Sequence, residues 1–276
     1  EKNNVYEIHL VGGEIFKHNN IIEMLEYLNK KNMTITVVTN ALGIDKKIIN
    51  IFKEMRNRLC VLVSIDGTKK MHDFIRGKGV FDTVIPKVKK MKNEKIEVEL
   101  LCTLNSINVD HTEKIVELAN EMDVPVNFNL FKPFNEKQKY LIVSPKKFFN
   151  TVEKLINLRI EKKYRIGVSD ASLSSYILGL PPKNECTATM SGIVINTDGK
   201  LVTCPYLLQA GYYKESDLIE FNEEFLKEWK NAKMYTEFRK NGQKGCQARS
   251  LIFSHDVKKG DPYDLSAYIK HKQLKA

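Results

Sequence analysis

The sequence has no apolar run long enough to cross a membrane and no start typical of a secreted protein. No uninterrupted apolar stretch approaches the ~18 residues of a membrane span, and residues 1–10 lack a basic start followed by an apolar run. These absences favour a soluble, cytoplasmic protein without a membrane partner. With 276 residues, of which 42% are hydrophobic, the chain can bury one large core, or one core plus a smaller domain.

Several motifs of common catalytic and metal sites are also absent. The chain has no G-x-G-x-x-G phosphate loop, no H-E-x-x-H zinc motif and no C-x-x-C pair. The chain has five cysteines, an odd number, at positions 60, 102, 186, 204 and 246. Because no secretion signal accompanies them, structural disulfides are not expected. Cys60 and Cys102 lie inside apolar runs, which predicts buried strand thiols without chemistry.

The net charge is +10, with a sequence pI of about 9.2. An acidic partner, such as nucleic acid or an anionic peptide, is one reading of this charge. A lysine-rich surface is the other. The lysines are spread over predicted helix ends and polar faces rather than gathered in one arm, so the charge alone does not indicate a nucleic-acid-binding protein.

The first half of the chain alternates apolar runs with segments of helical spacing. This repeated β-α pattern predicts a parallel sheet with crossover helices, an α/β fold. The predicted helices include segments around Ile21–Leu28 and Ile48–Met55. We count five strands: Val5–Val11, Met33–Thr39, Leu59–Ile65, Ile96–Leu104 and Val124–Phe131.

After Pro133 the pattern changes. It predicts a helix at about 145–163, a short helix at about 171–178, and a domain boundary near Pro181-Pro182, giving domains 1–180 and 181–276. Residues 192–204 predict a β-hairpin, because Asp198-Gly199 is a strong two-residue turn signal between two apolar segments. A helical stretch follows at about 222–239, and the residues from Asn241 on have weak periodicity.

Unusual residues follow the predicted strands at their carboxyl ends, where parallel sheets place their sites. Glycines there allow a ligand to approach the backbone closely, a carboxylate can hold an ammonium group, and a guanidinium can hold a carboxylate. Each motif alone also fits a simple strand-to-helix turn, but together they favour a shared site. The residues are Gly12, Gly13 and Glu14, then Thr39 and Asn40, then Ser64, Asp66 and Arg76, and finally Asn105 and, more weakly, Leu130.

These segments resemble a known superfamily, the radical S-adenosylmethionine (SAM) enzymes. "LVGGEIF" is similar to the family's "GGEP" segment, with Ile15 in place of proline, and Thr39-Asn40 is similar to its "TNG", with Ala41 in place of glycine. "VSIDG" followed by "HDFIRGKGVF" resembles the branch that modifies peptides and sulfatases, and His72 matches a histidine of that branch. The resemblance implies that Gly13 and Glu14 hold the methionyl amine, and that Ser64 and Arg76 contact the rest of SAM.

The C-terminal third extends the resemblance to the SPASM/twitch domain, a small α+β domain that holds an auxiliary [4Fe–4S] cluster. Cys186, Gly199 and Cys204 fit its opening pattern, and "NGQKGCQARS" followed by "GDPYD" resembles its close. Gln243 replaces the first cysteine of the family's C-x-x-C pair, and Asp264 replaces its last cysteine. The resemblance therefore implies Cys186, Cys204 and Cys246 as ligands, with Asp264 as a candidate fourth. Zinc held by these cysteines with Asp264 or His255, and three thiols without a metal, stay as alternatives.

One departure concerns the catalytic cluster. The family fold is a partial (β/α)6 barrel, in which the loop after the first strand carries C-x-x-x-C-x-x-C, and this motif occurs nowhere in the chain. Our count of five strands lacks the first βα unit. We therefore expect either that the chain is truncated or that it is a relative without the catalytic cluster. The abrupt start at what resembles the second strand favours a truncated chain. The catalytic [4Fe–4S] cluster is expected only if an upstream C-x-x-x-C-x-x-C segment exists.

The resemblance implies an enzyme that cleaves SAM reductively to a 5′-deoxyadenosyl radical, which abstracts hydrogen from a peptide or a tetrapyrrole-type cofactor precursor. An electron donor such as flavodoxin or ferredoxin is implied as a partner. A non-catalytic homologue that acts as a binding scaffold is the first alternative. A basic nucleic-acid-binding module is the second; nucleic acid is not otherwise expected as a partner.

Overall fold

A computed structural model describes residues 3–133, 135–169, 177, 186, 188–241 and 245–274. The chain divides into two compact units. The first comprises residues 1–104, 108–129 and 155–167, and the second comprises residues 105–107, 130–154 and 168–276. In the described part of the chain, no helix combines the length and the apolar content needed to cross a membrane.

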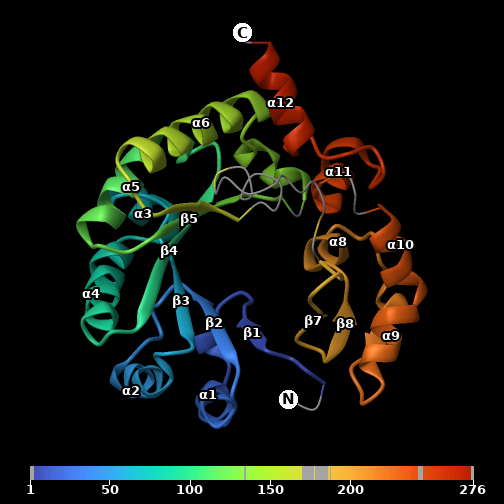
Figure 1. Ribbon diagram of the computed structural model, residues 1–276, viewed down its shortest axis with the longest axis horizontal. Helices are drawn as coiled ribbons and strands as arrows, with labels where there is room; N and C mark the ends of the chain where they lie inside the picture. The colour runs from blue at the N-terminus through green and yellow to red at the C-terminus, as the bar shows by residue number, and fades with distance from the viewer. Residues whose placement is uncertain are drawn as a thin grey trace. The chain divides into compact units, whose positions relative to one another are not determined.

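The first unit is built on a six-stranded sheet with the order β1-β2-β3-β4-β5-β6, of which Figure 1 labels β1 to β5. Strands β1 to β4 pair in parallel and in sequence order. The α/β fold is confirmed, and so are the five strands predicted from the apolar runs. The sixth strand was not predicted, because three residues are too few to show a period. The strands are β1 Glu7–Leu10, β2 Thr34–Thr39, β3 Leu59–Ser64, β4 Glu97–Leu104, β5 Val126–Leu130 and β6 Ile166–Val168.

Helices follow the strands and cover one face of the sheet, as Figure 1 shows for α1, α2, α4 and α5. Alternate strand residues on the covered face, such as Val37, Val61 and Phe128, are fully buried, whereas Cys60, Ser64 and others of the opposite face are half-buried. The covered face is therefore the core of the unit. The helices are α1 Ile21–Asn29, α2 Lys46–Met55, α3 Lys69–Arg76, α4 Val80–Asn93 and α5 Thr112–Glu121, with short 3-10 turns η1 Ile15–Lys17 and η2 Val109–His111.

The second unit contains the predicted hairpin. β7 (Val194–Ile195) and β8 (Lys200–Val202) pair antiparallel, and β9 (Ile219–Glu220), which was not predicted, adds a third strand. The turn uses Gly199 at φ 75°, a left-handed conformation that glycine adopts without strain. Leu201, Phe225, Met234 and Tyr235 form the buried cluster beside these strands.

The helices of this unit differ in part from the sequence prediction. The helix at 145–163 is confirmed as α6, Pro145–Glu161. The stretch at 222–239 is two helices that break at Ala232, where the backbone is extended (ψ 141°). Two helices also occur in the weakly periodic tail. The remaining elements are η3 Glu136–Leu141, α8 Pro205–Gln209, η4 Glu215–Asp217, α9 Phe225–Asn231, α10 Lys233–Asn241, α11 Gln247–Ser254 and α12 Leu265–Gln273.

Three sequence predictions fall wholly or largely outside the described residues. The short helix at about 171–178 is described only at Ile177, and the proposed boundary at Pro181-Pro182 lies in a segment that the structure does not describe. Gln243 lies outside the described part as well. The division into domains 1–180 and 181–276 stays a prediction.

Candidate functional site

Glu14 follows β1 and joins it to the end of β2. Its Oε1 accepts hydrogen bonds from the Thr39 hydroxyl at 2.7 Å and from the Phe16 backbone N–H at 3.2 Å, and its Oε2 accepts from the Asn40 backbone N–H at 2.7 Å. The side chain is half-buried. The carboxylate is thereby fixed at the carboxyl edge of the sheet, where the sequence predicted a ligand contact.

The backbone beside Glu14 is open on one side. A side chain built on Gly12 or on Gly13 would meet no atom within 4 Å. The neighbouring turn after β2 is tight: Ala41 has φ 60°, and its N–H donates to the Thr39 hydroxyl at 2.9 Å. A left-handed residue other than glycine is strained, which accounts for the glycine of the family's "TNG" at this position.

Asp66 follows β3 and is buried, with 2% of its surface exposed. Its Oδ2 accepts from the Arg76 Nε at 2.5 Å, and its Oδ1 accepts from the Thr103 backbone N–H at 3.0 Å. Its backbone N–H donates to the His72 Nδ1 at 3.1 Å, and its carbonyl accepts from the Asn108 amide at 3.2 Å. Asp66 therefore joins the ends of β3 and β4 to the helix α3 that follows.

Arg76 is the last residue of α3, and 35% of its side chain is exposed. The loop after it is closed by Asp73, whose Oδ1 accepts from the Phe81 N–H at 2.8 Å. This backbone hydrogen bond lowers the pKa of the Asp73 carboxyl. Gly77 at φ 116° and Gly79 at φ 82° make the turn possible. The loop thus fixes the end of α3 from which the guanidinium projects.

The other predicted cofactor residues differ in their surroundings. Ser64 ends β3 and is half-buried. Asn105 and Leu130 are buried and belong to the second unit; the Asn105 Oδ1 accepts from the Ile107 N–H at 2.9 Å. The structure therefore joins Glu14 with Asn40, and Asp66 with Arg76, by direct hydrogen bonds. Sequence reasoning gave no role to the Thr103 backbone N–H or to Asn108, because a backbone donor and a buried amide in a loop leave no motif.

The three C-terminal cysteines gather around one apolar cluster in the second unit. Cys186, Cys204 and Cys246 all pack, partly buried, against the cluster of Leu207, Phe238, Ala248 and Val257. Burial raises the pKa of the Cys204 thiol, and the charge of nearby Cys246 raises it as well. The fold thus brings together three thiols that are up to 60 residues apart in the sequence.

Asp264, the candidate fourth ligand, is the N-cap residue that precedes α12. Its Oδ1 caps this helix by accepting from the Ala267 N–H at 2.7 Å. It lies close to the cysteine loop, since a side chain built on Gly245 would come within 2.9 Å of the Asp264 Cβ. Helix capping therefore accounts for one carboxylate oxygen of Asp264, whether or not a metal is bound.

A buried ion pair supports the segment that carries Cys246. The Arg249 guanidinium binds Asp261, with 3% and 0% of the two side chains exposed. Asp261 also accepts hydrogen bonds from the backbone N–H groups of Cys246 at 2.9 Å and Tyr263 at 3.1 Å. Sequence reasoning gave these residues no role, although both lie in the segments that carried the resemblance.

Cys60 is less buried than the sequence predicted. Its side chain is half-buried and lies with Glu97 and Glu99 on the uncovered face of the sheet, where the three ligand atoms are all within 4.8 Å of one another. Burial and the three carboxylates of Glu99, Glu97 and Glu7 raise the pKa of the thiol to about 12. Cys102, in contrast, is fully buried, as predicted.

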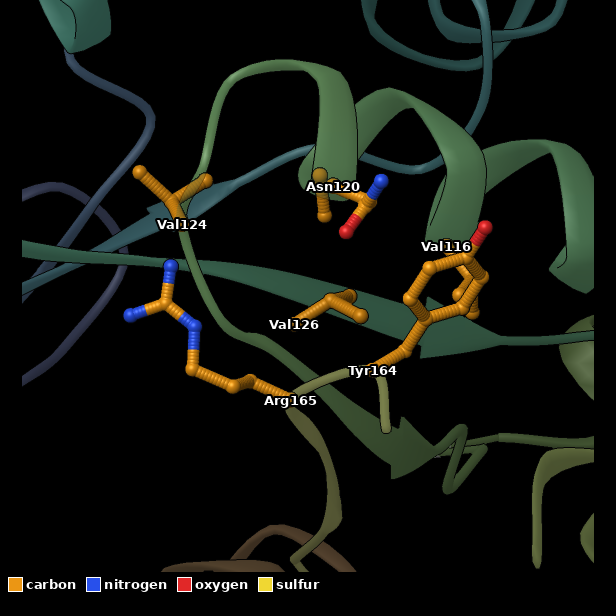
Figure 2. A pocket seen from close by; sticks show the side chains of 7 residues that line it. Val116, Asn120, Val124, Val126, Tyr164 and Arg165 are labelled. Atoms are coloured by element: carbon orange, nitrogen blue, oxygen red, sulfur yellow. The ribbon is translucent and has the colours of Figure 1, made fainter. Parts of the chain in front are cut away.

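A small pocket lies at the other edge of the sheet, beside the amino ends of β5 and β6 (Figure 2). Figure 2 shows Val126, Tyr164 and Arg165 around it, with Asn120 of α5 above. Its internal volume of about 10 Å³ is enough for at most a single water molecule. It is therefore not a site for a substrate or a cofactor.

Comparisons with known proteins found a family match and several related proteins. Residues 1–120 match the family described as the Radical SAM superfamily. A cysteine-type anaerobic sulfatase-maturating enzyme of Clostridium novyi is 27% identical over 245 residues, which cover 79% of this chain and 63% of that protein. The subtilosin biosynthesis protein AlbA of Bacillus subtilis is 30% identical over 123 residues, which cover 42% of this chain and 28% of that protein.

A solved structure shares the fold. The structure titled native anSMEcpe with bound AdoMet and Cp18Cys peptide has a TM-score of 0.72 at 21% identity and covers 98% of this chain and 82% of that one. The chain spans less than two thirds of the length of the curated relatives named above. The sequence match over residues 1–120 and the related maturation proteins support the resemblance of the chain to the radical SAM superfamily, and the solved structure supports the fold.

Proposed function

We propose that the chain is the SAM-binding core of a radical SAM enzyme that modifies a peptide or protein. The observation that carries this proposal is a fixed carboxylate, Glu14, after β1, and an oriented guanidinium, Arg76, at the end of the helix after β3, on one parallel sheet. Together they match the two charges at the amino-acid end of SAM. When bound, SAM supplies the hydrogen-abstracting chemistry of the superfamily, and this chain binds and orients it.

The residues present fit the methionyl ammonium. A carboxylate offers about four lone-pair positions, and three of those on Glu14 accept hydrogen bonds from Phe16, Thr39 and Asn40. The remaining position can accept one N–H of an ammonium group. The open backbone of Gly12 and Gly13 leaves room for a ligand beside it.

The residues also fit the methionyl carboxylate. Arg76 uses its Nε to bind Asp66, and no hydrogen bond of its two terminal NH2 groups occurs among the described residues. These two terminal NH2 groups, here called the Arg76 fork, suit a carboxylate, because they can bind it through two parallel hydrogen bonds. We assign the half-buried Ser64 hydroxyl, at the end of β3, to SAM as well.

The residues do not fit the catalytic [4Fe–4S] cluster. Such a cluster needs several thiolates that converge, and no cysteine of this sequence lies within 40 residues of Glu14 along the chain. Within the sheet, Cys60 is the second residue of β3 and lies away from its carboxyl end, and Cys102 faces the covered side. We therefore derive no step through this cluster.

An auxiliary cluster fits the second unit better. Cys186, Cys204 and Cys246 pack against one apolar cluster, which would shield a bound cofactor from water. Zinc fits less well: its ligands, at about 2.3 Å from the ion, lie about 3.8 Å apart. Among the described residues, these cysteines do not form a group of three ligand atoms within 4.8 Å. We propose an iron–sulfur cluster, whose thiolates bind different iron atoms.

The relatives favour a peptide over a tetrapyrrole precursor as substrate. One is named for sulfatase maturation, one for biosynthesis of the bacteriocin subtilosin, and the solved structure contains a peptide. We extend this substrate class to the present chain. An external electron donor such as ferredoxin or flavodoxin belongs to the same proposal.

Binding of SAM tests the proposal. We expect equilibrium dialysis of labelled SAM against the 276-residue chain to show one saturable site. Arg76→Ala removes a pair of charge-assisted hydrogen bonds and should weaken binding roughly 10- to 100-fold. The matched control is Arg56→Ala, since Arg56 is exposed at the end of α2. Absence of saturable binding, or equal losses in both variants, would contradict the proposal.

A further inference from the structure

The Arg76 guanidinium owes its orientation to a single buried carboxylate. Asp66 has 2% of its side chain exposed, whereas Arg76 has 35%, so one end of the pair is in the protein and the other faces outward. The bond uses the Nε of Arg76. Among the described residues, the two terminal NH2 groups of Arg76 make no hydrogen bond, so they stay available to a ligand.

Each polar group of Asp66 already has a partner within the protein. The two carboxylate oxygens accept from Arg76 and from the Thr103 N–H, the backbone N–H donates to His72, and the carbonyl accepts from Asn108. Thr103 is on β4, so the carboxylate is attached to the sheet and not only to its own loop. A group so engaged and so buried is not placed to contact a ligand directly.

His72 fixes the backbone of Asp66 from the helix α3. The His72 side chain is 1% exposed, and its Nδ1 accepts the Asp66 N–H at 3.1 Å, which puts the ring proton of the neutral form on Nε2. The imidazole packs edge-on against Phe81 at 5.9 Å. Gly67 allows the first turn of α3 to pack close to the loop after β3, since a side chain on Gly67 would come within 2.5 Å of the Met71 Cβ.

We propose that Asp66, held in place by His72 and the Thr103 N–H, is a positioning residue that aims the Arg76 fork at the carboxylate of SAM. The sequence placed Asp66 among the residues that contact the cofactor; the proposal gives it an indirect role instead. It rests on the proposed function, because it takes Arg76 as the carboxylate-binding group. The Asp66 charge is what matters, since an amide in its place would offer a donor to the Arg76 Nε or to the Thr103 N–H, which are themselves donors.

The test compares SAM with decarboxylated SAM, which keeps the adenosine, sulfonium and ammonium groups and lacks only the carboxylate. We expect Asp66→Asn to weaken SAM binding about tenfold. This is the loss expected when Arg76 is no longer oriented to make one charge-assisted hydrogen bond to the SAM carboxylate. Binding of decarboxylated SAM should stay unchanged. In the Arg76→Ala background, Asp66→Asn should have no further effect on either compound. Asp82→Asn is the matched control, because Asp82 binds Lys69 at the surface, with 63% of its side chain exposed.

The outcomes separate the inference from the proposed function. Equal losses for both compounds in Asp66→Asn would show a merely structural role and overturn the inference. Unchanged binding of both, beside a loss in Arg76→Ala, would overturn it too and leave the proposed function standing. If the wild-type chain binds neither compound, the proposed function fails and the inference with it. Far-UV circular dichroism of each variant shows whether it folds, and Asp66→Glu, which keeps the charge, should recover part of the preference for SAM.

Discussion

Replacing Arg249 with methionine is expected to destabilise the second unit by about 3–5 kcal/mol, the cost of leaving a buried charge without its partner. Asp261 is fully buried and receives the guanidinium together with two backbone N–H groups. Without Arg249, the negative charge of Asp261 stays buried and is not solvated by water. Because the Cys246 N–H donates to Asp261, the segment that carries Cys246 should become less ordered as well.

Urea denaturation followed by tryptophan fluorescence measures this effect, because Trp229 is the only tryptophan and belongs to the second unit. Lys233→Met is the matched control in the same unit. Its partner is Glu237 at 3.8 Å, and the two side chains are 86% and 56% exposed, so its loss should cost at most about 0.5 kcal/mol. A free energy of unfolding that falls equally little in both variants would contradict the structural role given to the buried pair.

Cys204→Ser should abolish the auxiliary cluster. After anaerobic reconstitution with iron and sulfide, we expect the wild-type chain to hold one cluster, and the variant to lose the bound iron and the visible absorption of the cluster. The reason is that a cluster with three available thiolates does not survive the loss of one. Iron and sulfide analysis of the two proteins measures the difference.

Cys60→Ser is the control for this experiment. Cys60 is half-buried on the sheet of the first unit and does not pack against the apolar cluster shared by the three C-terminal cysteines. The control should keep its iron. Iron retained in Cys204→Ser, or lost equally in both variants, would contradict the assignment of Cys204. A reconstituted wild-type chain with two clusters would contradict the statement that the catalytic site lacks its thiols.

The sequence predicted the regular part of the fold well, because long apolar runs alternate with helical segments over residues 5–132. Short elements escaped it: β6 and β9 have three and two residues, too few to show a period. The break at Ala232 is a change in one backbone angle, which leaves no mark in an apolar pattern. Helices α11 and α12 have weak amphipathic character, and their burial comes from tertiary contacts instead.

The candidate site was predictable as a set of residues but not as an arrangement. Glycine, carboxylate and guanidinium after the predicted strands indicated a ligand site, and in the structure these residues follow β1 and β3 of one parallel sheet. The direct partners could not be read from the sequence. Thr103 binds Asp66 through its backbone, and the ring nitrogen that His72 uses depends on how the chain folds around it. Buried pairs such as Arg249 and Asp261 look like ordinary surface charges in a sequence.

A crystal structure of the chain with SAM tests the central claim most directly. The account predicts the methionyl ammonium at hydrogen-bond distance from the Glu14 carboxylate and the methionyl carboxylate on the terminal nitrogens of Arg76, with Asp66 still bound to the Nε. SAM bound elsewhere on the chain, or bound at this edge with its carboxylate turned away from Arg76, would contradict it.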